Sequence, residues 1–165
     1  MITKMKLRNS IKAISFLVVL VFATTTIKAQ GRNDVIEAYN EGAKAVQTDP
    51  QAAIKDFEKV VLLSKQVGDS AADLKQKAIK VLPSLYYNVA SDALTAKKPA
   101  SEVILDAKKA VAAADKYDNA TTKQNANLIL IKGYNNLAGE YFSKDDYKNA
   151  LASFDSVLII NPDYA

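Results

Sequence analysis

The spacing of aromatic, apolar and small residues between positions 134 and 162 constrains the fold of this chain more than any other feature. Two sets of such residues recur at intervals of three and four, which places each set on one side of an α-helix. The first set is Tyr134, Leu137, Ala138 and Tyr141, and the second is Ala150, Phe154 and Val157. Asn161-Pro162 then marks a helix end. The segment predicts two helices that approach closely at Ala138 and Ala150, with the aromatic rings around that contact.

The same order of residues resembles the signature of the tetratricopeptide repeat (TPR) family. The resemblance implies helical hairpins that stack into a right-handed superhelix, with partners bound by residues of the first helices that face its concave side. On that register the candidate partner-binding residues are Tyr87, Ser91, Leu94, Asn135, Gly139 and Phe142. None of these is Lys or Arg, so the resemblance excludes the subclass that clamps the terminal carboxylate of a partner.

Apolar residues recur at helical spacing through the rest of the chain as well, and signals for strands are nearly absent. The predicted helices span residues 33–47, 51–66, 70–96, 100–116, 120–143 and 145–160. A shift of 48 residues aligns Leu82 with Leu130 and Tyr86 with Tyr134, which indicates an internal repeat. The predicted fold is therefore all-α, a right-handed superhelical stack of about three hairpins at residues 33–66, 70–116 and 120–160.

Short polar motifs predict where several of these helices begin. Asp49-Pro50 is a helix cap followed by proline at the first helical position. Residues 70–73 and 121–124 have the pattern of capping boxes. Asp145-Asp146 is also interpreted as a cap rather than as half of a metal site. Pro83 lies inside a predicted helix and is expected to kink or break it.

The first 29 residues have the layout of a secretory signal peptide. A basic segment precedes the apolar residues 13–23, and small and polar residues follow as far as Ala29. The apolar run of about eleven residues is too short to cross a bilayer, which takes about 20 residues. We predict cleavage near Ala29-Gln30 and export to the periplasm or the extracellular space. The alternative is an uncleaved N-terminal helix that tethers the domain to the inner membrane.

The basic character of the chain depends on this segment. The whole sequence has a net charge of +4, but five of its 22 basic residues and none of its 18 acidic residues lie in the first 29 positions. The remainder has 17 basic and 18 acidic residues, a net charge of −1. Because binding to nucleic acid relies on a net basic face, we exclude nucleic acid as a partner.

The chain has no His and no Cys. It therefore lacks the commonest general base and the strongest nucleophile of enzymes. No glycine-rich loop follows a predicted strand. We expect no catalytic activity, no cofactor and no metal ion, and packing alone must stabilise a domain that cannot form disulfides.

These observations predict an exported scaffold that mediates protein–protein interaction or assembly, with another protein or a peptide as its partner. A second possibility is a peptide- or saccharide-binding module that uses Tyr87 and Phe142. Exposed rings side by side in a groove would favour that module. A groove lined by Ala, Ser and Asn would favour contacts with a protein.

The end of the last predicted helix indicates a further surface. Four consecutive apolar residues, 157–160, cannot all face one hairpin core. We expect an interaction edge at Leu158, Ile159 and Tyr164, because a contiguous apolar patch usually marks an interface. Self-association, further repeats of a longer array, or docking of a different protein would each cover this edge.

Overall fold

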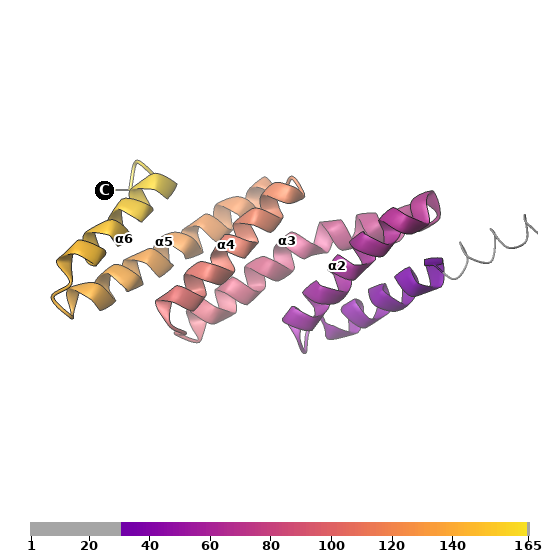
Figure 1. Ribbon diagram of the computed structural model, residues 1–165, viewed down its shortest axis with the longest axis horizontal. Coiled ribbons are helices and arrows are strands. Elements are labelled where there is room, and N and C mark those ends of the chain that lie inside the picture. The colour runs from indigo at the N-terminus through magenta and orange to yellow at the C-terminus, as the bar shows by residue number, and fades with distance from the viewer. Residues whose placement is uncertain (1–30, 165) are drawn as a thin grey trace, which may run out of the picture.

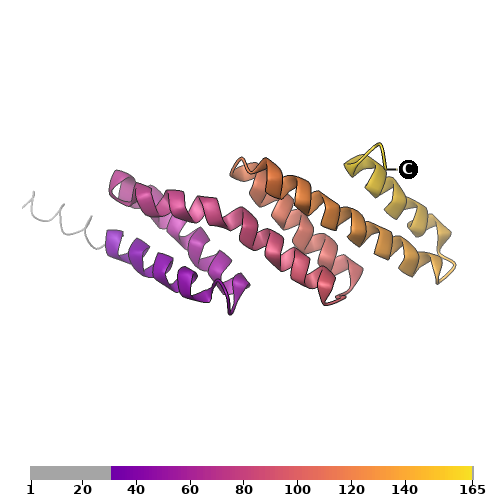
Figure 2. The same ribbon diagram turned by 180° about the vertical axis from the view of Figure 1, so that it is seen from behind.

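The computed structural model describes residues 31–164, and this part of the chain is all-α, as predicted. A helical stretch at residues 31–45 precedes five packed helices (Figure 1, Figure 2). These are α2 (Pro50–Val67), α3 (Ala72–Thr95), α4 (Ala100–Lys116), α5 (Ala120–Phe142) and α6 (Tyr147–Ile160). A short 3-10 helix, η1 (Gly68–Ala71), joins α2 to α3. The predicted signal peptide, residues 1–29, lies outside the described residues.

The helices pack in sequence as adjacent pairs. Each of α2 to α5 contacts the next helix, and α3 also contacts α5. Within the described residues, no Cα atom of α2 comes within 8 Å of α4, and the same holds for α4 and α6. Both views show the helices following one another along the long axis, with residues 31–45 at one end and α6 at the other (Figure 1, Figure 2).

Two apolar clusters form the core, and α3 is long enough to enter both. The first cluster lies between residues 31–45, α2 and the first half of α3, with Phe57, Val60 and Leu82 almost fully buried. The second lies between the end of α3, α4 and α5, and includes Val103 and Leu130. Because α3 carries residues of both clusters, it holds the two halves of the described domain together.

Helix starts agree with the sequence at some positions and not at others. Asp49 caps α2 as predicted, and its carboxylate accepts a hydrogen bond from the Ala52 N–H at 3.0 Å. Both predicted capping boxes are wrong. Residues 70 and 71 belong to η1, and Asp73 instead accepts a hydrogen bond from Arg32 at 3.2 Å. At α5 the cap is Asn119 and not Thr121. The Asn119 side chain accepts a hydrogen bond from the Thr122 N–H, the third N–H of the helix, and residue 121 already lies inside the helix.

Three successive helices end with the same backbone motif. A residue with positive φ follows α3, α4 and α5, and these residues are Lys97, Asp118 and Asp145, at 53°, 53° and 58°. The next N–H then donates to a carbonyl five residues earlier, as from Lys98 to Ala93 at 3.0 Å. In this type of helix C-terminus, one residue with a left-handed backbone conformation lets the following N–H groups bond to carbonyls that have no partner within the helix.

The structure also corrects two expectations about packing. Of the expected kink or break at Pro83, the break is wrong, because α3 continues to Thr95 with Pro83 and Leu82 both buried, so that packing offsets the lost hydrogen bond. Ala138 and Ala150 are buried, as expected of a close helix contact. Phe154, however, is 46% exposed and does not fill the space beside them.

Candidate protein-interaction surface

An open depression of about 550 Å³ lies between the end of α3 and the second half of α5. Three of the predicted partner-binding residues line it: Leu94 from α3, and Asn135 and Gly139 from α5. The other lining residues are Lys97, Lys98, Ala100, Asn136 and Glu140. The fold thus brings together residues about 40 positions apart. The sequence register that resembles the tetratricopeptide repeat had placed these same residues on one surface.

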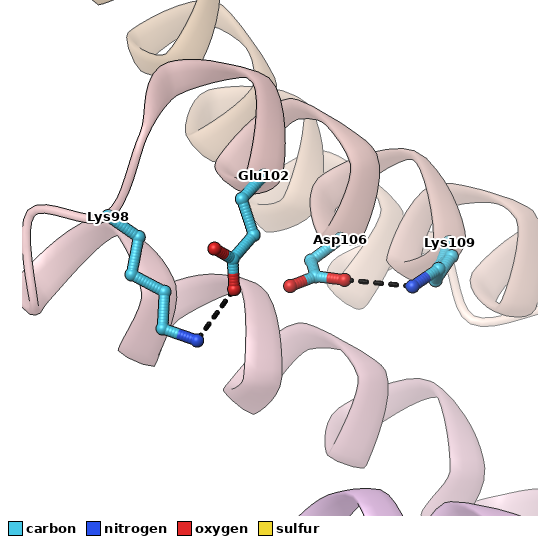
Figure 3. Close-up of polar contacts among 4 residues, drawn as sticks. All are labelled: Lys98, Glu102, Asp106 and Lys109. Carbon is cyan, nitrogen blue, oxygen red and sulfur yellow. Dashed lines mark hydrogen bonds and ion pairs between the residues drawn. The ribbon is translucent and has the colours of Figure 1, made fainter.

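The depression offers hydrogen-bonding groups and charges of both signs. A Cβ atom added at Gly139 would meet no atom within 4 Å, so the backbone there is open to a partner. The Asn135 amide donates to the Tyr164 hydroxyl at 3.2 Å. At the rim, Lys98 donates to Glu102 at 2.6 Å, and this hydrogen bond raises the pKa of Lys98 (Figure 3). The surface can therefore hold polar groups in defined places.

The other three predicted partner-binding residues do not line the depression. Tyr87 is half-buried and packs against the second apolar cluster. Ser91 is also half-buried, and its carbonyl accepts a hydrogen bond from the Thr95 hydroxyl. Phe142 is exposed, and its ring meets the Tyr147 ring edge-on with centroids 5.3 Å apart. No aromatic ring lines the depression.

A second hollow lies around Tyr86, which the sequence aligned with Tyr134 of the predicted helix contact and did not mark as a site. Within the described residues no Cα atom of α2 comes within 8 Å of α4, and the small cavities between these helices reach Tyr86 of α3. The Tyr86 hydroxyl donates to the Glu58 carboxylate at 2.8 Å. Burial and this carboxylate both raise the pKa of Tyr86 well above its usual range. Tyr86 lines two small cavities there, of about 210 and 250 Å³.

Charged groups from α4 complete this hollow. Asp106 is nearly buried, and Lys109 donates to it at 3.0 Å (Figure 3). The Tyr117 hydroxyl is buried and has no hydrogen-bond partner among the described residues. The Lys116 ammonium lies 5.1 Å from the centre of the Tyr117 ring. The signal in the sequence was Asp106, an acid on a helix face that is otherwise alanine and branched apolar residues.

The acidic pair before α6 acts as a cap, as predicted. The Asp146 carboxylate accepts a hydrogen bond from the Asn149 N–H at 3.2 Å, and Asp145 accepts one from the Tyr147 hydroxyl at 2.8 Å. Across residues 31–164, no three acidic side chains come close enough to hold a metal ion together. None of the helices in that range combines the length and the apolar character that crossing a bilayer requires.

The predicted C-terminal edge residues have different surroundings. Leu158 and Ile159 are 46% and 82% exposed, whereas Val157 is buried against α5. Tyr164 folds back toward α5 through its contact with Asn135. The edge is therefore apolar at α6 itself, and Tyr164 belongs to the side that carries the depression.

Comparison with known proteins gives no relative from which a role could be carried over: neither a family description, nor a curated protein, nor a solved structure matches this chain.

Proposed function

We propose that this protein is an exported scaffold of TPR-like helical hairpins that binds another protein or a peptide along the side formed by α3 and α5. In a stack of hairpins, the first helices adjoin each other along the concave side. The contact of α3 with α5, without any contact of α2 with α4 or of α4 with α6, supports this arrangement. The shared ending of α3, α4 and α5 supports it too, because repeated units repeat their turns.

The observation that carries the proposal is the depression. It joins Leu94 of the second predicted hairpin to Asn135 and Gly139 of the third, and adds Lys97 and Glu140 at its rim. Amide groups and paired charges suit a polypeptide, whose backbone and side chains supply matching donors and acceptors. The depression shows none of the aromatic lining that the saccharide alternative requires, so we favour a protein or peptide partner over a sugar.

Gly139 allows a sharp test. Replacing Gly139 by Arg projects a long side chain into the depression from a position with free space, and a helical Gly can be replaced without loss of stability. Ala152→Arg, at an exposed position of α6, is the matched control. Both variants should melt at or above the temperature of the parent protein.

The readout is capture of polypeptides from the native envelope after cross-linking, followed by mass spectrometry. We expect the parent protein and Ala152→Arg to retain the same polypeptide, and Gly139→Arg to lose it. Equal capture by both variants, or no polypeptide captured by the parent, would show that the depression is not the binding surface.

A further inference from the structure

An apolar stripe runs along the whole length of α6. Tyr147, Leu151, Phe154 and Leu158 are 57%, 63%, 46% and 46% exposed. Their spacing of four, three and four residues places them in one line on the helix surface. Among the described helices α6 is the last, and none of the others lies beyond it (Figure 1).

Most of the equivalent positions of the two earlier helices are buried, and Val111, the twelfth residue of α4, is half-buried. The fifth, eighth and twelfth residues of α2 are Ile54, Phe57 and Val61, which are 8%, 2% and 8% exposed and belong to a cluster with residues of α3 and of the stretch 31–45. The fifth and eighth residues of α4 are Ile104 and Ala107, which are 7% and 0% exposed and pack with residues of α5. In this fold these positions receive a packed helix, and on α6 the same positions are left without one.

A partner can reach the stripe without disturbing the domain. Ala150, Ser153 and Val157 are the buried residues of α6, and at 100° per residue the stripe is centred about 100° around the helix from them. The contact with α5 therefore stays intact when a second helix packs on the stripe. Phe142 extends the apolar surface beyond Tyr147.

The charges beside the stripe indicate what the second helix is. Lys148 and Asp155 are seven residues apart, so they lie on the same edge of the stripe, the edge away from α5. Both are exposed, and neither forms an ion pair within residues 31–164. When two copies of this edge run in opposite directions, the cation of each copy lies beside the anion of the other.

We propose that the stripe packs against the same stripe of a second copy, with the two α6 helices antiparallel around a two-fold axis near Leu151 and Phe154. Tyr147 then lies opposite Leu158 of the partner subunit, and Leu151 opposite Phe154 of the partner subunit. Lys148 lies beside Asp155 of the partner subunit, and the two-fold axis makes this ion pair twice. A parallel pair would instead place the two edges on opposite sides of the helix pair, where neither ion pair could form.

The size of the stripe sets the expected strength. Since a Phe or Tyr ring alone can bury about 150–250 Å², the partly covered stripe with Phe142 offers on the order of 500 Å² per copy. A symmetric pair then buries about 1,000 Å² in total, the lower limit for a specific interface. We therefore expect a weak dimer with a dissociation constant on the order of 10–100 μM. The inference concerns a different surface from the depression and does not depend on the proposed function.

Sedimentation equilibrium of the purified protein from about 1 μM to about 1 mM spans that range on both sides. We expect the mass to rise from that of one chain to that of two. Leu151→Glu should remain a single chain throughout, because it buries a charge in the stripe. Ile159→Glu is the matched control: Ile159 is exposed but lies off the stripe, so this variant should dimerise like the parent protein.

Charge reversal tests the antiparallel arrangement. Lys148→Glu or Asp155→Lys turns two attractions into two repulsions, so each should weaken the dimer by about tenfold. The double variant restores both pairs with reversed signs and should dimerise within about threefold of the parent protein. A parent protein that stays a single chain at 1 mM, a Leu151→Glu variant that still dimerises while its melting temperature is unchanged, or a double variant no better than the single ones would each overturn the proposal.

Discussion

Helix α5 packs tightly against α4 at Gly133. A Cβ atom built on Gly133 would lie 2.9 Å from Ile104 Cγ1 and 3.5 Å from Val103 Cγ1. Carbon atoms in contact normally stay about 3.5–4.0 Å apart. Ile104 is only 7% exposed and belongs to the second apolar cluster, so it cannot swing away into solvent. Gly133→Ala must therefore push α4 and α5 apart or force Ile104 off its rotamer.

Two opposing effects decide the result. Overpacking of a core contact costs about 1–3 kcal/mol, whereas replacing Gly by Ala in a helix contributes about 1 kcal/mol. We expect a net loss of about 1 kcal/mol in the free energy of unfolding, measured by urea denaturation. Gly139→Ala is the matched control in the same helix, because its Cβ meets nothing within 4 Å. That variant should gain about 0.5–1 kcal/mol.

A double-mutant cycle identifies the cause. Ile104→Ala removes the atom that the new Cβ meets and by itself costs about 2–5 kcal/mol. In that background Gly133→Ala should no longer destabilise and should stabilise by about 1 kcal/mol, a coupling of about 2 kcal/mol. If Gly133→Ala stabilises the parent protein as much as Gly139→Ala does, the close approach is absent and the reasoning is refuted.

Three further predictions address other parts of the chain. Tyr86→Phe should cost about 1 kcal/mol, because it removes a hydrogen bond to a carboxylate, while Tyr87→Phe should cost little. The raised pKa of Tyr86 keeps its hydroxyl protonated in the folded state. Its contribution to the free energy of unfolding is therefore complete below the ordinary tyrosine pKa near pH 10 and declines as the pH rises above it. The decline should be absent in Tyr86→Phe when the free energy of unfolding is measured against pH. Ala138→Leu should cost about 1–3 kcal/mol in a fully buried position, whereas Ala152→Leu, at an exposed position, should change stability little. Intact-mass measurement of the exported protein should show the loss of residues 1–29, and retention of that segment would mean an uncleaved leader.

The helices could be predicted from the sequence because their signals are local. Apolar spacing sets each helix, and Asp49-Pro50 fixes the start of α2 within the one or two residues by which helix limits ordinarily vary. The capping boxes failed for the same local reason. A Thr or Ser three residues before a Gln or Asp fits the pattern, but Asn119 reaches the first turn of α5 before Thr121 can. Several candidate caps close together cannot be ranked without the backbone.

The candidate surfaces could be predicted only in part, because they depend on which helices touch. The register of α3 and α5 placed Leu94 and Asn135 on one surface, and both line the depression. Tyr86 follows core spacing, and nothing in that spacing shows that α2 and α4 stay apart and leave it reachable. Phe154 was placed beside the contact of Ala138 with Ala150 by its spacing from Ala150 and Val157, but that spacing does not show how much of the ring faces solvent, and the ring is 46% exposed.

The eighth residue of α2, α4 and α6 differs in size, and its size decides what can pack on that face of each helix. In α2 it is Phe57, a buried ring of the first apolar cluster that also meets the Tyr39 ring edge-on, with centroids 5.5 Å apart. In α4 it is Ala107, which is fully buried on the same face as Ile104, the residue that a Cβ atom at Gly133 of α5 would meet. In α6 it is Phe154, so a helix that packs on α6 must leave room for a ring. A second copy meets this need at Leu151, whose smaller side chain would lie opposite the ring on each side of the two-fold axis.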